Sequence, residues 1–148
     1  MKADVTIFEM GPRDGLQNES KFINTFDKIK LVNLLSKSGL SKIETASFVS
    51  SRWVPQMADG EQVMDGIQRE QGVSYTALTP NKKGLDRAIQ ANADEIAIFG
   101  SASEGFSKAN INKSIKESLQ LFRPILDAAP MPVRGYVSCV TALIPFSD

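Results

Sequence analysis

The sequence predicts an α/β fold built on a parallel sheet, and three observations support this. Short β-rich runs alternate with stretches of helical periodicity along the 148 residues, in the order β-α-β-α-β-α-β-α-β. Polar side chains collect directly after several of the β-rich runs. No repeat or low-complexity segment interrupts the alternation, so residues 1–148 are predicted to form a single domain with right-handed crossovers.

The first strand and the first helix are predicted from residues 5–10 and 26–40. The run VTIFEM is typical of a strand, and FDKIKLVNLLSKSGL has apolar residues at helical spacing. Thr25 is the expected N-cap of this helix and Gly39 its stop. The apolar stripe consists of Phe26, Ile29, Val32 and Leu35.

The second strand is predicted at KIETASF, residues 42–48. The helix after it is expected to begin at Asp59, because Asp59 and Gln62 have the spacing of a capping box. The expected buried face of this helix consists of Val63, Met64 and Ile67.

The third strand is predicted at VSYTAL, residues 73–78. Pro80 disfavours helix in the residue before it, and Asn81 is a suitable cap for the next helix. The expected buried face of that helix consists of Leu85, Ala88 and Ile89.

The last elements are a fourth strand at residues 94–100, a helix at about 112–129 and a fifth strand at 133–140. In the helix, Ile115, Leu119 and Phe122 have core spacing. Pro124 lies inside it and is expected to kink or divide the helix.

Two architectures fit this order of elements. One is a (β/α)₈ barrel, of which the chain would hold about the first five strands and four helices, since a whole barrel takes about 250 residues. The other is a complete five-stranded doubly wound sheet, which the length favours. Polar residues follow four different strands, as the mouth of a barrel requires, and this favours the barrel.

Composition excludes several classes of protein. The 17 basic and 17 acidic residues balance, which gives no electrostatic reason to expect nucleic acid or a membrane surface as partner. Cys139 is the only cysteine, the start of the chain has no presequence pattern, and no apolar run reaches about 18 residues, so a cytoplasmic location is predicted. The sequence contains no histidine, the commonest general base and neutral metal ligand.

The segment EMGPRDGLQNE, residues 9–19, is the first candidate site. Asp14 is a hard oxygen ligand suited to Mg²⁺ or Mn²⁺, and the guanidinium of Arg13 suits a carboxylate or an enolate. RDG is also an ordinary turn sequence, so a structural role is the alternative. Glu44 lies in an apolar strand, where a carboxylate needs a partner, and either a catalytic role or a structural ion pair with Arg13 fits it.

Five segments together resemble the hydroxymethylglutaryl-CoA lyase family of metal-dependent TIM-barrel enzymes. They are VTIFEMGPRDGLQNE, IETASFVSSRWVPQMAD, LTPNKKGLDRAI, IFGSASEGFSKANIN and VRGYVSC, and they span residues 5–139. The resemblance implies divalent-metal-dependent retro-Claisen cleavage of 3-hydroxy-3-methylglutaryl-CoA to acetoacetate and acetyl-CoA, in leucine degradation and ketone body formation.

The resemblance also implies roles for single residues. Asp14 matches the metal-binding aspartate, Arg13 the catalytic arginine that contacts the substrate, and Glu44 an acidic residue of the same catalytic site. Gln17 is implied to line the site, and Asn110 to lie near the acyl-CoA entrance. The cofactor implied is Mg²⁺ or Mn²⁺, and the partner an acyl-CoA substrate.

The sequence departs from the family after residue 139, where the tail VTALIPFSD replaces the usual pattern. Family members continue for about another half barrel, which carries two histidines, an asparagine and a cysteine of the active site. The 148-residue chain is therefore expected to be inactive alone and to self-associate through exposed strand edges. A non-catalytic α/β binding module and a truncated pseudoenzyme are the alternative functions.

Overall fold

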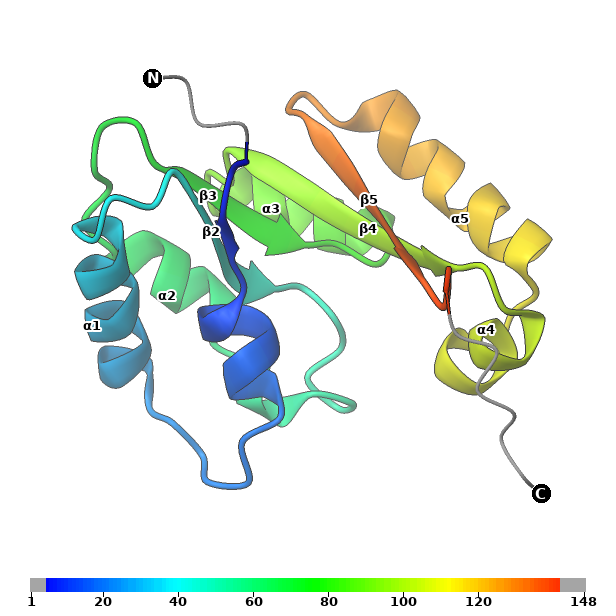
Figure 1. Cartoon of the computed structure of the whole chain (residues 1–148), viewed down its shortest axis with the longest axis horizontal. Helices are drawn as coiled ribbons and strands as arrows, with labels where there is room; N and C mark the ends of the chain where they lie inside the picture. The colour runs from blue at the N-terminus through cyan, green and yellow to red at the C-terminus, as the bar shows by residue number, and fades with distance from the viewer. Residues whose placement is uncertain (1–4, 142–148) are drawn as a thin grey trace.

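The computed structural model describes residues 5–141, which form one five-stranded parallel sheet (Figure 1). The predicted tail at 140–148 lies outside the described residues from 142 onward. The strands are β1 (Phe8–Glu9), β2 (Lys42–Ser47), β3 (Ser74–Leu78), β4 (Glu95–Ser101) and β5 (Val133–Ser138). Each strand pairs in parallel with the next one along the chain.

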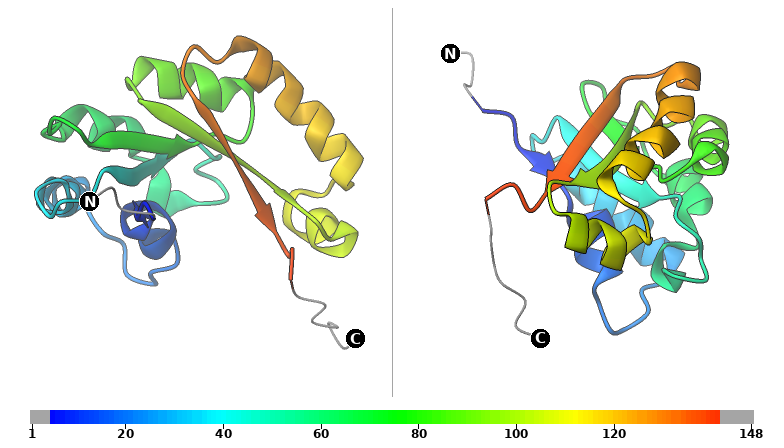
Figure 2. Two further views of the ribbon diagram at one scale, coloured as in Figure 1. Left: turned by 45° about the horizontal axis from the view of Figure 1, so that its top comes forward. Right: turned by 90° about the vertical axis from the view of Figure 1, so that its right-hand side faces the viewer.

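The strand order decides between the two predicted architectures. In a doubly wound sheet the order reverses at a switch point, whereas here it is β1-β2-β3-β4-β5 throughout. The sheet is curved, and helices cover its outer face (Figure 2). The half-barrel prediction is therefore confirmed and the doubly wound alternative is wrong. No helix in the described part of the chain is both long enough and apolar enough to cross a membrane.

The helices are α1 (Thr25–Ser36), α2 (Gly60–Gly66), α3 (Lys82–Gln90), α4 (Glu104–Ile111) and α5 (Ile115–Ala128), with a π-helix η1 (Gly11–Gly15) and a 3₁₀ turn η2 (Pro55–Met57). The core lies between the helices and the outer face of the sheet. It includes Ile43, Tyr75, Ala77 and Ile96 from the strands and Val32, Met64, Leu85 and Ile125 from the helices. Each large apolar side chain buried here contributes about 1.5–3 kcal/mol.

Helix α1 differs from its prediction at the N-terminus and on its buried face. Asn24, not Thr25, caps it, by accepting from the backbone N–H of Asp27. The buried residues are Lys28, Val32 and Ser36, whereas Phe26 is 73% exposed. Lys28 can lie inside because its ammonium group is paired with Asp59, at 2.7 Å.

That pairing also explains why the predicted capping box at Asp59 is absent. Asp59 does stand at the N-cap position of α2, but its carboxylate accepts from Lys28 and from the hydroxyl of Thr25 instead of from the helix backbone. The predicted buried face of α2 is confirmed by Val63, Met64 and Ile67.

The later helices follow their predictions in part. Asn81 caps α3 as expected, and Leu85 and Ala88 are buried, but Ile89 is 38% exposed. The buried face of α5 is Ser118, Phe122 and Ile125, so Leu119 lies outside it. A helical stripe is defined only by its period, and packing onto the sheet decided which of two adjacent stripes faces inward.

Three local features were not predicted. Residues 11–15 wind into a π-helix, α4 occupies part of the loop expected after β4, and α5 continues across Pro124 without division. Pro124 lies on the exposed side of α5, where water can solvate the carbonyl group that its ring leaves without a donor.

Candidate functional site

A cavity of about 920 Å³ opens at the carboxyl ends of the strands. Four of the five predicted site residues line it, namely Arg13, Asp14, Gln17 and Asn110. The fifth, Glu44, lies beneath the cavity wall and its side chain is fully buried. This is the end of a parallel α/β barrel at which catalytic residues gather.

The π-helix η1 buries the side chain of Arg13 and leaves that of Asp14 exposed. The backbone N–H groups of Arg13, Asp14 and Gly15 all donate to the carbonyl oxygen of Met10, at 3.2, 2.8 and 3.3 Å. Pro12 stands at the start of this helix, where its missing N–H costs no hydrogen bond. Arg13 is thereby buried at 8% exposure, while the side chain of Asp14 is 57% exposed.

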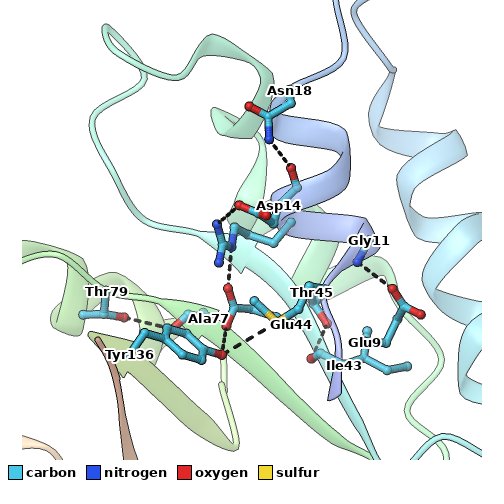
Figure 3. Close-up of polar contacts among 12 residues, drawn as sticks. Glu9, Gly11, Asp14, Asn18, Ile43, Glu44, Thr45, Ala77, Thr79 and Tyr136 are labelled. Atoms are coloured by element: carbon cyan, nitrogen blue, oxygen red, sulfur yellow. Dashed lines mark hydrogen bonds and ion pairs between the residues drawn. The ribbon is translucent and has the colours of Figure 1, made fainter. Parts of the chain in front are cut away.

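Arg13 is held by two carboxylates. Its Nε atom donates to Oε1 of Glu44, and its Nη1 atom donates to Oδ1 of Asp14 at 2.6 Å (Figure 3). The ion pair with Glu44, one of the two alternatives for that residue, is therefore present. Among the described residues, Nη2 of Arg13 has no hydrogen-bond partner, so this edge of the guanidinium can serve a ligand.

Tyr136 completes this group from β5, the edge strand at the other end of the sheet, and sequence reasoning missed it. Its hydroxyl donates to Oε2 of Glu44 at 2.7 Å, and its ring lines the cavity (Figure 3). Burial, followed by the hydrogen bond to the Glu44 carboxylate, raises the pKa of Tyr136 well above its usual range. The phenol therefore stays protonated and acts as a donor.

The other cavity residues offer hydrogen-bonding groups. The side-chain oxygen of Gln17 is buried and has no donor within the described part of the chain, so it is available to an N–H or O–H group. Asn110 lies near the end of α4. Trp53, which was not among the predicted site residues, also lines the cavity and is 81% exposed.

A divalent cation fits this site only in part. Asp14 is the one carboxylate among the described residues that line the cavity, and it is exposed enough to reach an ion. Within residues 5–141 there is no group of three or more histidine, cysteine, aspartate or glutamate side chains placed to hold a metal. The residues present therefore provide one hard oxygen ligand and not a closed site.

Comparison with known proteins agrees with the fold. Residues 4–137 match the family model described as HMGL-like. The chain is 57% identical over 139 residues to the mitochondrial hydroxymethylglutaryl-CoA lyase of Gallus gallus, covering 92% of this chain and 47% of that protein. It is 58% identical over 138 residues to the cytoplasmic 3-hydroxy-3-methylglutaryl-CoA lyase of Mus musculus, covering 91% and 40%.

Solved structures give the same result. Hydroxymethylglutaryl-CoA lyase from Pseudomonas aeruginosa superposes with a TM-score of 0.93 at 51% identity, over 97% of this chain and 49% of that one. An HMG-CoA lyase in complex with coenzyme A and 3-methylmalate superposes with a TM-score of 0.86 at 39% identity, over 93% and 47%. The chain thus spans about half the length of the relatives it matches, and it belongs to the HMGL-like family.

Proposed function

We propose that the chain forms the arginine–aspartate side of a hydroxymethylglutaryl-CoA lyase site. The observation that carries this proposal is the placement of Arg13 and Asp14, in contact with each other, on the wall of a cavity large enough for an acyl thioester. Relatives at 57–58% identity are named as lyases of this substrate. Because the chain spans about half of them, other residues of a complete enzyme would share the site.

In the proposed reaction the tertiary hydroxyl of the substrate loses a proton and the adjacent carbon–carbon bond breaks. The electron pair moves to the thioester, as an enolate that is then protonated on carbon. Arg13 would donate from its unpaired edge to the thioester oxygen, where negative charge develops. Asp14 would be one ligand of Mg²⁺ or Mn²⁺, an ion that, when bound, lowers the pKa of a coordinated hydroxyl.

The remaining residues support binding. Gln17 would accept a hydrogen bond from the substrate, and Asn110 would contact the acyl-CoA at the side of the cavity formed by α4. Glu44 does not reach the cavity, so it would contribute to catalysis through Arg13. Leucine degradation and ketone body formation remain predictions that follow from this assignment. A cytoplasmic location remains a prediction from composition, because one of these relatives is named as mitochondrial and the other as cytoplasmic.

Binding without cleavage is the second candidate for the 148-residue chain alone. It is favoured by the single carboxylate ligand found among the described cavity residues. A regulatory module or a pseudoenzyme would bind the ligand in this way without cleaving it.

The test is calorimetric binding of 3-hydroxy-3-methylglutaryl-CoA to the purified chain with and without Mg²⁺. We expect Arg13→Met to weaken binding by on the order of tenfold, since a charge-assisted contact contributes about 1.5–3 kcal/mol. Free coenzyme A is the control ligand, because it lacks the acyl group that Arg13 contacts. Equal affinity of the wild type and Arg13→Met for the acyl-CoA would contradict the proposal.

A further inference from the structure

Tyr136 links two strands that are distant in the sheet. It comes from β5, whereas Glu44 comes from β2, and β3 and β4 lie between them. The two residues are 92 positions apart in the chain, yet the Tyr136 hydroxyl lies 2.7 Å from Oε2 of Glu44. Because the sheet is curved, the side chains of Tyr136 and Glu44 meet on its concave side (Figures 2 and 3).

The contact leaves Glu44 with a donor on each oxygen. Arg13 donates to Oε1, Tyr136 donates to Oε2, and the side chain of Glu44 has no exposed surface. The terminal torsion of a glutamate is otherwise broad, so two donors on opposite oxygens are what fix the plane of this carboxylate. Removal of the phenol would leave Oε2 a buried acceptor without a partner.

The plane of the Glu44 carboxylate in turn directs Arg13. The guanidinium is planar and rigid, so its anchors at Nε and Nη1 determine where its remaining edge points. The Nη1 anchor is Asp14, which is half exposed and therefore less constrained. The buried anchor at Glu44 is the one that sets the direction.

Packing alone does not account for a tyrosine at this position. A phenylalanine would supply the same ring to the cavity wall, and the hydroxyl adds two contacts, the one with Glu44 and one with the sulfur of Met10 at 3.7 Å. Met10 is the residue whose carbonyl oxygen organises the π-helix that carries Arg13. The hydroxyl therefore contacts two residues, Glu44 and Met10, that each hold Arg13 in place.

We propose that Tyr136 is a positioning residue of this site, which orients Arg13 by fixing the carboxylate of Glu44. The proposal rests on the proposed function, in which Arg13 contacts the thioester. Tyr136 acts through the hydrogen-bonded chain Tyr136–Glu44–Arg13 and takes no part in bond making or breaking.

The first measurement is hydrogen exchange of the Arg13 Nε–H by ¹⁵N NMR in the wild-type chain, with Arg13→Lys to assign the signal. Arg123, whose side chain is 78% exposed, is the internal reference. We expect the Arg13 proton to exchange at least about tenfold more slowly than that of Arg123, because it is buried and hydrogen-bonded. Exchange as fast as that of Arg123 would overturn the proposal before any variant of Tyr136 is made.

The second measurement compares Tyr136→Phe with Tyr75→Phe. Tyr75 is the control for the half-buried Tyr136, because it is a buried tyrosine whose hydroxyl also donates a hydrogen bond, but to Ser36 in the helical layer outside the sheet. We expect Tyr136→Phe to accelerate exchange of the Arg13 Nε–H about tenfold and Tyr75→Phe to leave it within about twofold. An unchanged Arg13 signal in folded Tyr136→Phe would overturn the proposal.

A nearly isosteric change covers the case in which Tyr136→Phe does not fold. The chain has two tyrosines, so 3-fluorotyrosine incorporated into the Tyr75→Phe variant labels Tyr136 alone. Fluorination makes the phenol a stronger donor to Glu44, and we expect the Arg13 Nε–H resonance to shift. An unshifted resonance would overturn the proposal.

Acyl-CoA binding separates this proposal from the proposed function. If both hold, Tyr136→Phe weakens binding of 3-hydroxy-3-methylglutaryl-CoA, but less than Arg13→Met does. If Arg13→Met binds like the wild type while the Arg13 Nε–H still responds to Tyr136→Phe, the proposed function fails and the orienting role of Tyr136 stands.

Discussion

Arg13 and Glu44 form a buried ion pair across 31 positions of the chain, from a π-helix to the middle of the neighbouring strand β2. The Glu44 side chain has no exposed surface and that of Arg13 is 10% exposed, so the pair is shielded from water. A buried charge is costly unless its partner and its hydrogen bonds are in place. The stability of this fold and the orientation of the Arg13 guanidinium in the cavity therefore depend on the same ion pair.

Loss of the Glu44 charge is expected to destabilise the chain. Glu44→Gln leaves Arg13 buried without its carboxylate partner, and in comparable pairs such a loss costs about 3–5 kcal/mol of unfolding free energy. Urea unfolding at neutral pH measures this cost. Asp86→Asn is the matched control, since it makes the same chemical change in the exposed pair Lys82–Asp86 and should cost at most about 1 kcal/mol. Similar costs for the two variants would show that Glu44 is not held as described.

Metal binding is expected to depend on Asp14. The chain should bind Mn²⁺ weakly, and Asp14→Asn should lower the affinity by at least on the order of tenfold, because the variant loses the carboxylate at the cavity. Water-proton relaxation with Mn²⁺ measures this. Asp65→Asn, which removes an exposed carboxylate from α2, should leave the affinity unchanged. If Asp14→Asn and Asp65→Asn changed the Mn²⁺ affinity equally, the ion would not bind at Asp14.

Alkaline pH is expected to destabilise the chain through Tyr136. Because burial and Glu44 raise its pKa in the folded state, the folded chain keeps the proton where the unfolded chain releases it, above about pH 10. The contribution to stability is full below that pH and is lost as the pH rises toward the folded-state pKa. Tyr136→Phe should therefore lose less stability than the wild type between about pH 9 and 11, measured by urea unfolding.

The single tyrosine of the Tyr75→Phe variant provides a direct check on this expectation. Its phenol, observed by ultraviolet absorbance, should ionise above the ordinary value of 10.0. Ionisation at the ordinary value in the folded chain would contradict the contact with Glu44.

The bottom of the half barrel contains a second buried carboxylate. Burial opposes ionisation of Glu95, but hydrogen bonds from Lys42 and Arg134 outweigh it and hold the pKa of Glu95 below its ordinary value. This contribution to stability is present above the unfolded-state pKa of about 4.3 and is lost as the pH falls through the lower folded-state value. In Lys42→Met the pKa of Glu95 should rise, measured by carbon NMR of the carboxyl group, while Lys82→Met should leave it unchanged.

The 148-residue chain is expected to self-associate. β1 and β5 each pair with only one strand among the described residues, and Val5, Ile7, Val137 and Val140 near them are 61–77% exposed. Sedimentation velocity should show species larger than a monomer at micromolar concentration. A compact monomer at all concentrations would contradict this.

Cleavage by the chain alone is not expected. The described cavity residues provide Asp14 as a metal ligand and no second carboxylate, so turnover of 3-hydroxy-3-methylglutaryl-CoA with Mg²⁺ or Mn²⁺ should stay at background. Acetoacetate formation measures it. Metal-dependent product formation that Arg13→Met abolishes would overturn this expectation.

The sequence was sufficient for the features that depend on neighbours along the chain. All five strands were found from β-rich runs, and the site segment around Arg13 and Asp14 was found because its polar groups directly follow a strand. The predictions of helix caps were less reliable. Asn81 caps α3 as expected, but the carboxylate of Asp59 pairs with Lys28 instead of capping α2.

Only the tertiary structure decided which helical face is buried and which distant groups meet. The period of α5 allowed Leu119 or Ser118 to face the sheet, and packing selected Ser118. The contact of Tyr136 with Glu44 depends on the accumulated curvature of the three strand pairings from β2 to β5, which leaves no local pattern in the sequence. Periodicity is a property of residues that are close in the sequence, whereas the curvature of the sheet results from the pairing of strands that are far apart in the sequence.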